Sequence, residues 1–168
     1  MKRIFFSWVS IVLMTFSARF QPLQQFTVTV DSNKSFLSLS HKKAFTANEA
    51  VTVKDALNIA LVFSNELIEW YNMEKRHEKV PPGLTGTKTG IAAISFDREQ
   101  FDQCKTSADL KRMTGHITKN SFSHFALIRN GSSSLQHCFI AETQEGKRCL
   151  LFVTVINGNS FKVEVKSE

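Results

Sequence analysis

The carboxy-terminal third of the chain carries apolar runs that mostly alternate with polar residues, the pattern of strands that bury one face. These runs cover residues 135–143, 147–156 and 161–165, with a shorter run at 123–128. Glu145-Gly146 and Asn157-Gly158 separate the three longer runs and are typical of hairpin turns. In the last run the side chains expected in the core are Phe161, Val163 and Val165, and those expected in water are Lys162, Glu164 and Lys166. The segment predicts an antiparallel meander.

Strand signals also occur nearer the amino terminus. Residues 26–30 alternate apolar and polar side chains, and residues 35–39 contain a second apolar run. Asp31-Ser32-Asn33 lies between them and has turn chemistry, so we expect an opening hairpin. The short apolar run at residues 91–96 predicts a buried strand.

Residues 53–71 fit two patterns. Their apolar positions recur at helical spacing for about five turns. Within them, Leu57, Ile59, Leu61 and Phe63 also alternate with the period of a strand. The greater length of the first pattern favours a helix that begins near Val53, and whether residues 57–63 are helix or strand stays open.

Helix-start signals occur at four places. Thr46 with Glu49, Thr52 with Asp55, and Asp97 with Gln100 have the spacing of a capping box, and a further helical turn starts at Ser107 and closes at Gly115. Together with the meander, these signals predict an α+β fold, a single domain over residues 19–168 built on an antiparallel β-sheet with one or two helices. A chain of 168 residues is long enough for one such domain.

The first 18 residues have the features of a secretory signal peptide. Lys2 and Arg3 precede an apolar run at residues 4–14, and the small or polar residues Thr15, Ser17 and Ala18 follow it. The run is shorter than the ~20 apolar residues that span a bilayer, so we expect no stable membrane span. The expected location is secreted, periplasmic or at the cell surface.

Charge and composition narrow the class of partner. The 42% hydrophobic and 21% charged content is that of a globular chain, which excludes disordered and fibrous classes. The formal net charge of +6 falls to +4 without Lys2 and Arg3, and it is spread along the chain. We find no basic stripe interleaved with aromatic residues, so we expect no nucleic-acid partner.

The three cysteines suggest one disulfide, because exported chains meet oxidising conditions. Cys138 and Cys149 cannot pair across the predicted meander: a two-residue turn leaves them about 13 Å out of register, and a three-residue turn puts them on opposite faces. We therefore expect Cys104 to pair with Cys138 or Cys149, with three buried thiols as the alternative.

No catalytic, metal-binding or cofactor-binding residues are assigned from the sequence. The five histidines and three cysteines lack zinc-ligand spacing. Residues 40–43 match SxxK and residues 88–90 match KTG, yet the chain is far too short for a serine β-lactamase, so both matches are interpreted as chance. Asp97 with Glu99 or Asp102 forms the one carboxylate pair considered for a hydrolase.

Short segments resemble a loose group of exported bacterial proteins of unknown function. The resemblance rests on residues 43–50, 142–150 and 161–166 and extends over residues 35–166. It brings no catalytic residue. A helix followed by antiparallel strands is also similar to secreted cystatin-like or cathelicidin-like domains, although the inhibitory Gln-x-Val-x-Gly loop of cystatins is absent. Asn33 and Asn130 fit the N-glycosylation pattern, which would support that second resemblance.

These observations favour a non-enzymatic exported module that binds a protein or glycan partner or joins a surface assembly. The competing expectations are a secreted hydrolase that uses paired carboxylates, and a secreted cystatin-like protein. Paired carboxylates in a cleft would favour the hydrolase.

Overall fold

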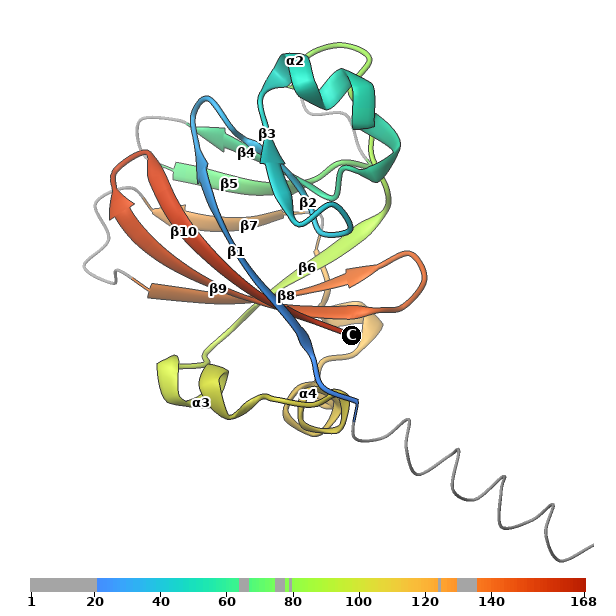
Figure 1. Cartoon of the computed structure of the whole chain (residues 1–168), viewed down its shortest axis with the longest axis vertical. Helices are drawn as coiled ribbons and strands as arrows, with labels where there is room; N and C mark the ends of the chain where they lie inside the picture. The colour runs from blue at the N-terminus through green and yellow to red at the C-terminus, as the bar shows by residue number, and fades with distance from the viewer. Residues whose placement is uncertain (1–20, 64–66, 75–77, 79, 124, 130–135) are drawn as a thin grey trace, which may run out of the picture.

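Two antiparallel sheets of five strands each face one another in the computed structural model, which describes residues 21–63, 67–74, 78, 80–123, 125–129 and 136–168 (Figure 1). The first sheet has the strand order β1 (Gln24–Asp31), β10 (Ser160–Ser167), β9 (Arg148–Asn157), β8 (Gln136–Thr143) and β6 (Thr89–Ile94). The second has the order β3 (Lys43–Phe45), β2 (Phe36–Ser38), β4 (Ile59–Phe63), β5 (Leu67–Asn72) and β7 (Phe125–Arg129).

The main core lies between the inner faces of the two sheets. Trp70 of the second sheet is fully buried there, and its ring centroid lies 5.5 Å from that of Phe139 and 6.1 Å from that of Phe161 of the first sheet. Tilted and edge-on aromatic pairs at these distances add stabilisation beyond the area that they bury. The sheets are therefore joined across their centre by large side chains.

Short helices cover the outer face of each sheet (Figure 1). α3 (Arg98–Gln103) and α4 (Ser107–Thr114) cover the first sheet, where Phe101 packs on Phe152 of β9 with ring centroids 5.2 Å apart. The α2 helix (Ala47–Ala50) and the 3-10 helix η1 (Val51–Ala56) cover the second sheet. A second 3-10 helix, η2 (Lys119–Ser121), follows α4. The predicted α+β class is confirmed.

The carboxy-terminal meander is confirmed, since β8, β9 and β10 are neighbours in that order. The turn between β8 and β9 holds three residues rather than two, because Thr143 and Lys147 close it with an N–O distance of 2.9 Å. Gly146 occupies the left-handed region there, with a φ of 78°. Two capping boxes are also confirmed, at Thr46 with Glu49 and at Asp97 with Gln100.

The predicted opening hairpin is wrong. A turn does form after β1, where Asp31 accepts hydrogen bonds from the backbone amides of Asn33 and Lys34. The strands on its two sides enter different sheets, however, and β1 pairs along its whole length with β10. The turn that the sequence predicts does form. The partner of β1, however, is the distant strand β10 and not the strand that follows the turn.

The favoured helix over residues 53–71 is also wrong. The structure has η1, then β4 and β5, which pair with each other in an antiparallel register. Leu61 faces the main core, whereas Ala60 and Val62 face the cluster beneath α2 and η1, so both faces of β4 are buried. A strand buried on both faces is apolar throughout, and such a run imitates helical spacing. Thr52 forms no capping box with Asp55; it lies in η1, next to a kink at Val53, and its hydroxyl donates to the Glu49 carbonyl.

Lys166 is a third correction, because it is 4% exposed rather than facing water. Its ammonium donates to the carbonyls of Phe101 at 2.7 Å and Cys104 at 2.9 Å, and a longer bond reaches the Asp102 carbonyl. These carbonyls belong to the end of α3, where the regular helical bonds stop, and the Phe101 carbonyl also accepts from the Cys104 amide at 3.2 Å. Burial lowers the pKa of Lys166. The side chain holds α3 against the first sheet.

Among the described residues, no helix combines the length and the apolar character needed to cross a bilayer.

Candidate functional site

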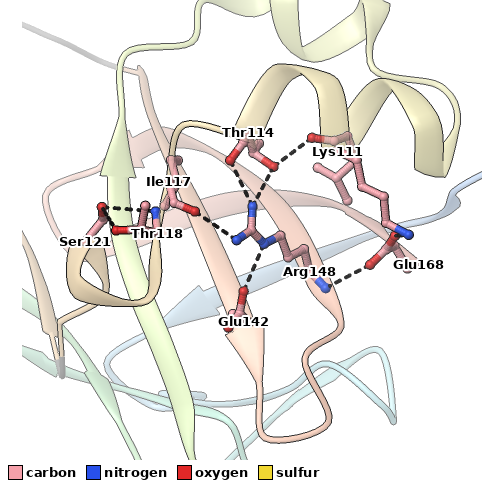
Figure 2. A network of polar contacts seen from close by, with 9 residues as sticks. Lys111, Thr114, Ile117, Thr118, Ser121, Glu142, Arg148 and Glu168 are labelled. Carbon is pink, nitrogen blue, oxygen red and sulfur yellow. Dashed lines mark hydrogen bonds and ion pairs between the residues drawn. The ribbon is translucent and has the colours of Figure 1, made fainter.

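Arg148 is the centre of a polar network at the end of the first sheet where β8 turns into β9 (Figure 2). Its Nε donates to Glu142 Oε2 at 2.9 Å, within the same hairpin. Nη1 donates to the carbonyl and the hydroxyl of Thr114, at 2.8 and 3.2 Å, and Nη2 donates to the Ile117 carbonyl at 2.9 Å. All three guanidinium nitrogens are engaged, so Arg148 fixes the segment after α4 onto the sheet.

The network continues to both sides of Arg148. The carboxylate of Glu168 accepts from the Arg148 backbone amide at 3.3 Å and pairs with Lys111 of α4 at 3.4 Å. Beyond Ile117 the chain forms η2, and the guanidinium lies 5.7 Å from the ring centroid of Phe122, which follows η2. Arg148 thus positions η2 and Phe122 as well as Glu142.

A cleft of about 730 Å³ opens beside this network. We call it the braced cleft; its lining residues are Glu74, Gly86, Lys88, Gly90, Lys119, Phe122, Glu142, Thr143 and Gln144. One wall comes from the segment that enters β6, one from η2 and one from the β8–β9 hairpin. Its volume lies within the range of small-ligand sites, roughly 300–1,000 Å³.

Two glycines in the walls of the braced cleft lie so close to neighbouring residues that a side chain would not fit. A Cβ on Gly86 would lie 2.2 Å from the Leu57 carbonyl oxygen and 2.4 Å from Met73 Cβ. A Cβ on Gly90 would lie 2.8 Å from Phe122 Cβ. The absence of a side chain at Gly90 therefore lets Phe122 pack directly on β6.

A second hollow of about 400 Å³ lies on the other side of Thr143, which lines both. Its floor includes the buried Asn58, whose Oδ1 accepts from the Leu39 amide at 2.8 Å. The Nδ2 of Asn58 donates to the hydroxyls of Thr87 at 2.9 Å and Thr89 at 3.1 Å. The amide is thus fully engaged, and it joins the turn after β2 to the segment that enters β6.

All three cysteines are buried free thiols in the structure, and they lie in two different clusters. Cys104 and Cys138 belong to the cluster beneath α3 and α4, whereas Cys149 faces the main core. This separation follows from the three-residue turn between β8 and β9. Burial raises the pKa of Cys138 to about 12 and that of Cys149 to about 12. Of the two pairings considered, only Cys104 with Cys138 joins residues of one cluster; the disulfide itself stays a prediction.

For protein recovered from an oxidising compartment, we expect iodoacetamide in denaturant without reductant to label one thiol, Cys149. Reduction before labelling is expected to give three labelled thiols, read from the intact mass. The native protein is expected to resist labelling at pH 8, because the thiolate is the reactive form and burial raises the thiol pKa values. Three labels without reductant would contradict the pairing, and the Cys104→Ala variant controls for chance oxidation.

The other residues singled out from the sequence serve structural roles or lie outside the described residues. Asp97 caps α3 by accepting from the Gln100 amide at 2.8 Å, Asp102 pairs with Arg98 at 3.0 Å, and Glu99 accepts from Gln103. Asn33 is exposed in its turn, and Asn130 lies outside the described residues. The Lys43 ammonium pairs with Glu49 at 3.5 Å.

Sequence reasoning missed the braced cleft. Lys88 and Gly90 were noticed only as ends of a chance KTG match, and residues 142–150 only as parts of a predicted hairpin and as a segment of resemblance. A basic residue at the start of a mostly apolar strand such as β9 is the one available signal, because a partly buried charge must find partners. Those partners come from residues 114–117 and 142, which no local pattern connects.

Among the described residues, no group of three or more histidine, cysteine, aspartate or glutamate side chains converges as a metal site. Nothing in the described part of the chain indicates catalysis. Comparison with protein-family models, with curated proteins and with solved structures finds no match. The site must therefore be interpreted from its own geometry.

Proposed function

We propose that the chain is an exported, non-enzymatic binding module whose ligand site is the braced cleft. The observation that carries the proposal is the way the cleft is built. Arg148 and Glu142 form its frame; their side chains are 19% and 18% exposed and are bonded to each other. The side chains at its opening, among them Lys88, Lys119 and Gln144, are polar and exposed. A rigid frame with free polar groups at its mouth supports recognition of a polar ligand.

Binding is favoured over hydrolysis by the state of the carboxylates. Glu142 is held by Arg148, and Glu74 lies 3.8 Å from Lys88. A general acid requires a carboxyl whose pKa is raised toward neutrality. The carboxyl of Glu145 beside the cleft instead has a lowered pKa, because the neighbouring Thr143 hydroxyl and its own backbone amide stabilise the carboxylate. Export is supported by the signal-peptide pattern at residues 1–18.

The proposal is tested by titrating the labelled protein with mixtures of soluble oligosaccharides and of short peptides while recording amide chemical shifts. We expect a binding mixture to shift the amides of residues 88–90, 119–122 and 142–144. The Lys88→Gln variant should weaken that response. Lys34 is an exposed lysine just beyond the end of β1 that is remote from Arg148, so Lys34→Gln should leave the response unchanged.

Three results would contradict the proposal. If ligands shift only amides away from the cleft, the cleft is not the binding site. If the protein converts a bound ligand chemically, it is an enzyme. An intact mass that retains Met1 in protein from an exporting host, instead of a start near Ala18 or Arg19, would remove the export assignment.

A further inference from the structure

Two lysine ammonium groups at the braced cleft are available to a ligand. Lys88 comes from the segment that enters β6, and its side chain is 63% exposed with Glu74 at 3.8 Å. A long ion pair in water contributes little, so a ligand can replace it at low cost. Lys119 comes from η2 and is exposed, and among the described residues no carboxylate lies within ion-pair distance of it.

We propose that the ligand of the braced cleft is an acidic saccharide, a sugar ring that carries a carboxylate, such as a uronic acid. The proposal rests on the function proposed above, because it specifies the ligand of the same cleft. A lysine ammonium is a compact charge with three rotatable donors and suits a single carboxylate on a mobile ring. The fork of Arg148 is already occupied, so the charged contacts to a ligand are left to these two lysines.

The other lining groups fit the remaining parts of a sugar ring. Phe122 is half-buried and offers an apolar surface for the C–H face of a pyranose. Gln144 of the hairpin wall supplies a neutral polar group for ring hydroxyls, and Glu74 adds a carboxylate acceptor. The cleft thus combines one apolar face with several polar groups, whereas an apolar peptide anchor would need a hydrophobic pocket.

The charge of the whole chain supports the same class of ligand. The proposed exported chain is basic, with a formal net charge of +4 once Lys2 and Arg3 are removed, and the glutamate nearest Arg148 is neutralised by it. An anionic polysaccharide is therefore attracted before it contacts the cleft, and this attraction weakens as salt is added.

The test compares trigalacturonic acid with its fully methyl-esterified form, which keeps the rings and removes the charge. Calorimetric titration of the full chain at low salt should show the acid binding about tenfold more tightly than the ester, consistent with loss of about one strong charge contact. Lys88→Gln and Lys119→Gln should each weaken binding of the acid about fivefold. Lys34→Gln is the matched control and should leave the affinity unchanged.

Amide shifts recorded with the same probes separate failure of this inference from failure of the proposed function. Equal affinity for acid and ester, with shifts in the cleft, would overturn the acidic ligand and retain the binding site. Tighter binding of a phosphorylated peptide or a short nucleic acid in the cleft would overturn it in the same way. If no saccharide, peptide or nucleic acid shifts the cleft amides, the proposed function falls as well.

Discussion

Gly86→Ala is expected to lower the free energy of unfolding by about 3 kcal/mol, at the upper end of the cost of overpacking. The new Cβ would lie 2.2 Å from the Leu57 carbonyl oxygen, a backbone atom that cannot rotate away. Two hydrogen bonds depend on the same approach, Gly86 N to Met73 O at 3.1 Å and Thr87 N to Leu57 O at 2.8 Å. Separating the segments to admit the methyl group strains both bonds.

Gly83→Ala is the matched control for this prediction. It makes the same chemical change three residues earlier, where a Cβ would meet nothing within 4 Å. Its φ of 88° still favours glycine, so we expect a cost of about 1 kcal/mol from backbone strain alone. Urea unfolding of both variants measures the difference in the free energy of unfolding. Equal decreases would show that the close approach to Leu57 adds no cost.

Arg148→Met is expected to destabilise the fold by about 3 kcal/mol, because it removes one partner from a largely buried ion pair. The change leaves Glu142 without its cation, removes the Arg148 donor from the Ile117 carbonyl, and leaves the Thr114 carbonyl with the Ile117 amide alone. Arg148→Lys should recover little of the loss, since an ammonium cannot reproduce the planar fork that reaches three segments. The measurement is the free energy of unfolding in urea.

The double variant Arg148→Met with Glu142→Gln separates the cost of the orphaned charge from the cost of the lost carbonyl bonds. Neutralising Glu142 should make the double variant more stable than Arg148→Met alone, by about 1 kcal/mol or more. Strict additivity of the two changes would mean that the pair contributes nothing. If Arg148→Lys is as stable as the wild type, the planar shape of the guanidinium is not what stabilises this site.

Sequence patterns predicted those parts of the fold that are decided within a few residues. The capping boxes at Thr46 and Asp97 and the turn at residues 157–158 are local, because each side chain bonds backbone groups three or fewer residues away. The meander is nearly as local, since each strand pairs with the next. The secreted location and the disulfide stay predictions.

The parts that sequence reasoning missed depend on distant segments. The apolar run of β4 was interpreted as helix because its second buried face comes from α2, η1 and residues 80–84, which no period in the run reveals. Lys166 was expected in water because the carbonyls that bind it lie more than 60 residues away, at the end of α3. The braced cleft joins three such distant segments, so its residues have no common signal in the sequence.

The pairing of β1 with β10 has a consequence for how the chain reaches its native state. A chain that is made or delivered amino end first presents residues 24–31 before their partner at residues 160–167 exists, and all other strands precede that partner. The edge of β9 therefore stays unpaired until residues 160–167 arrive, and bringing β1 to those residues closes a long loop at a cost in entropy. Completion of the first sheet is thereby coupled to the arrival of residues 160–167, the strand that joins β1 to β9.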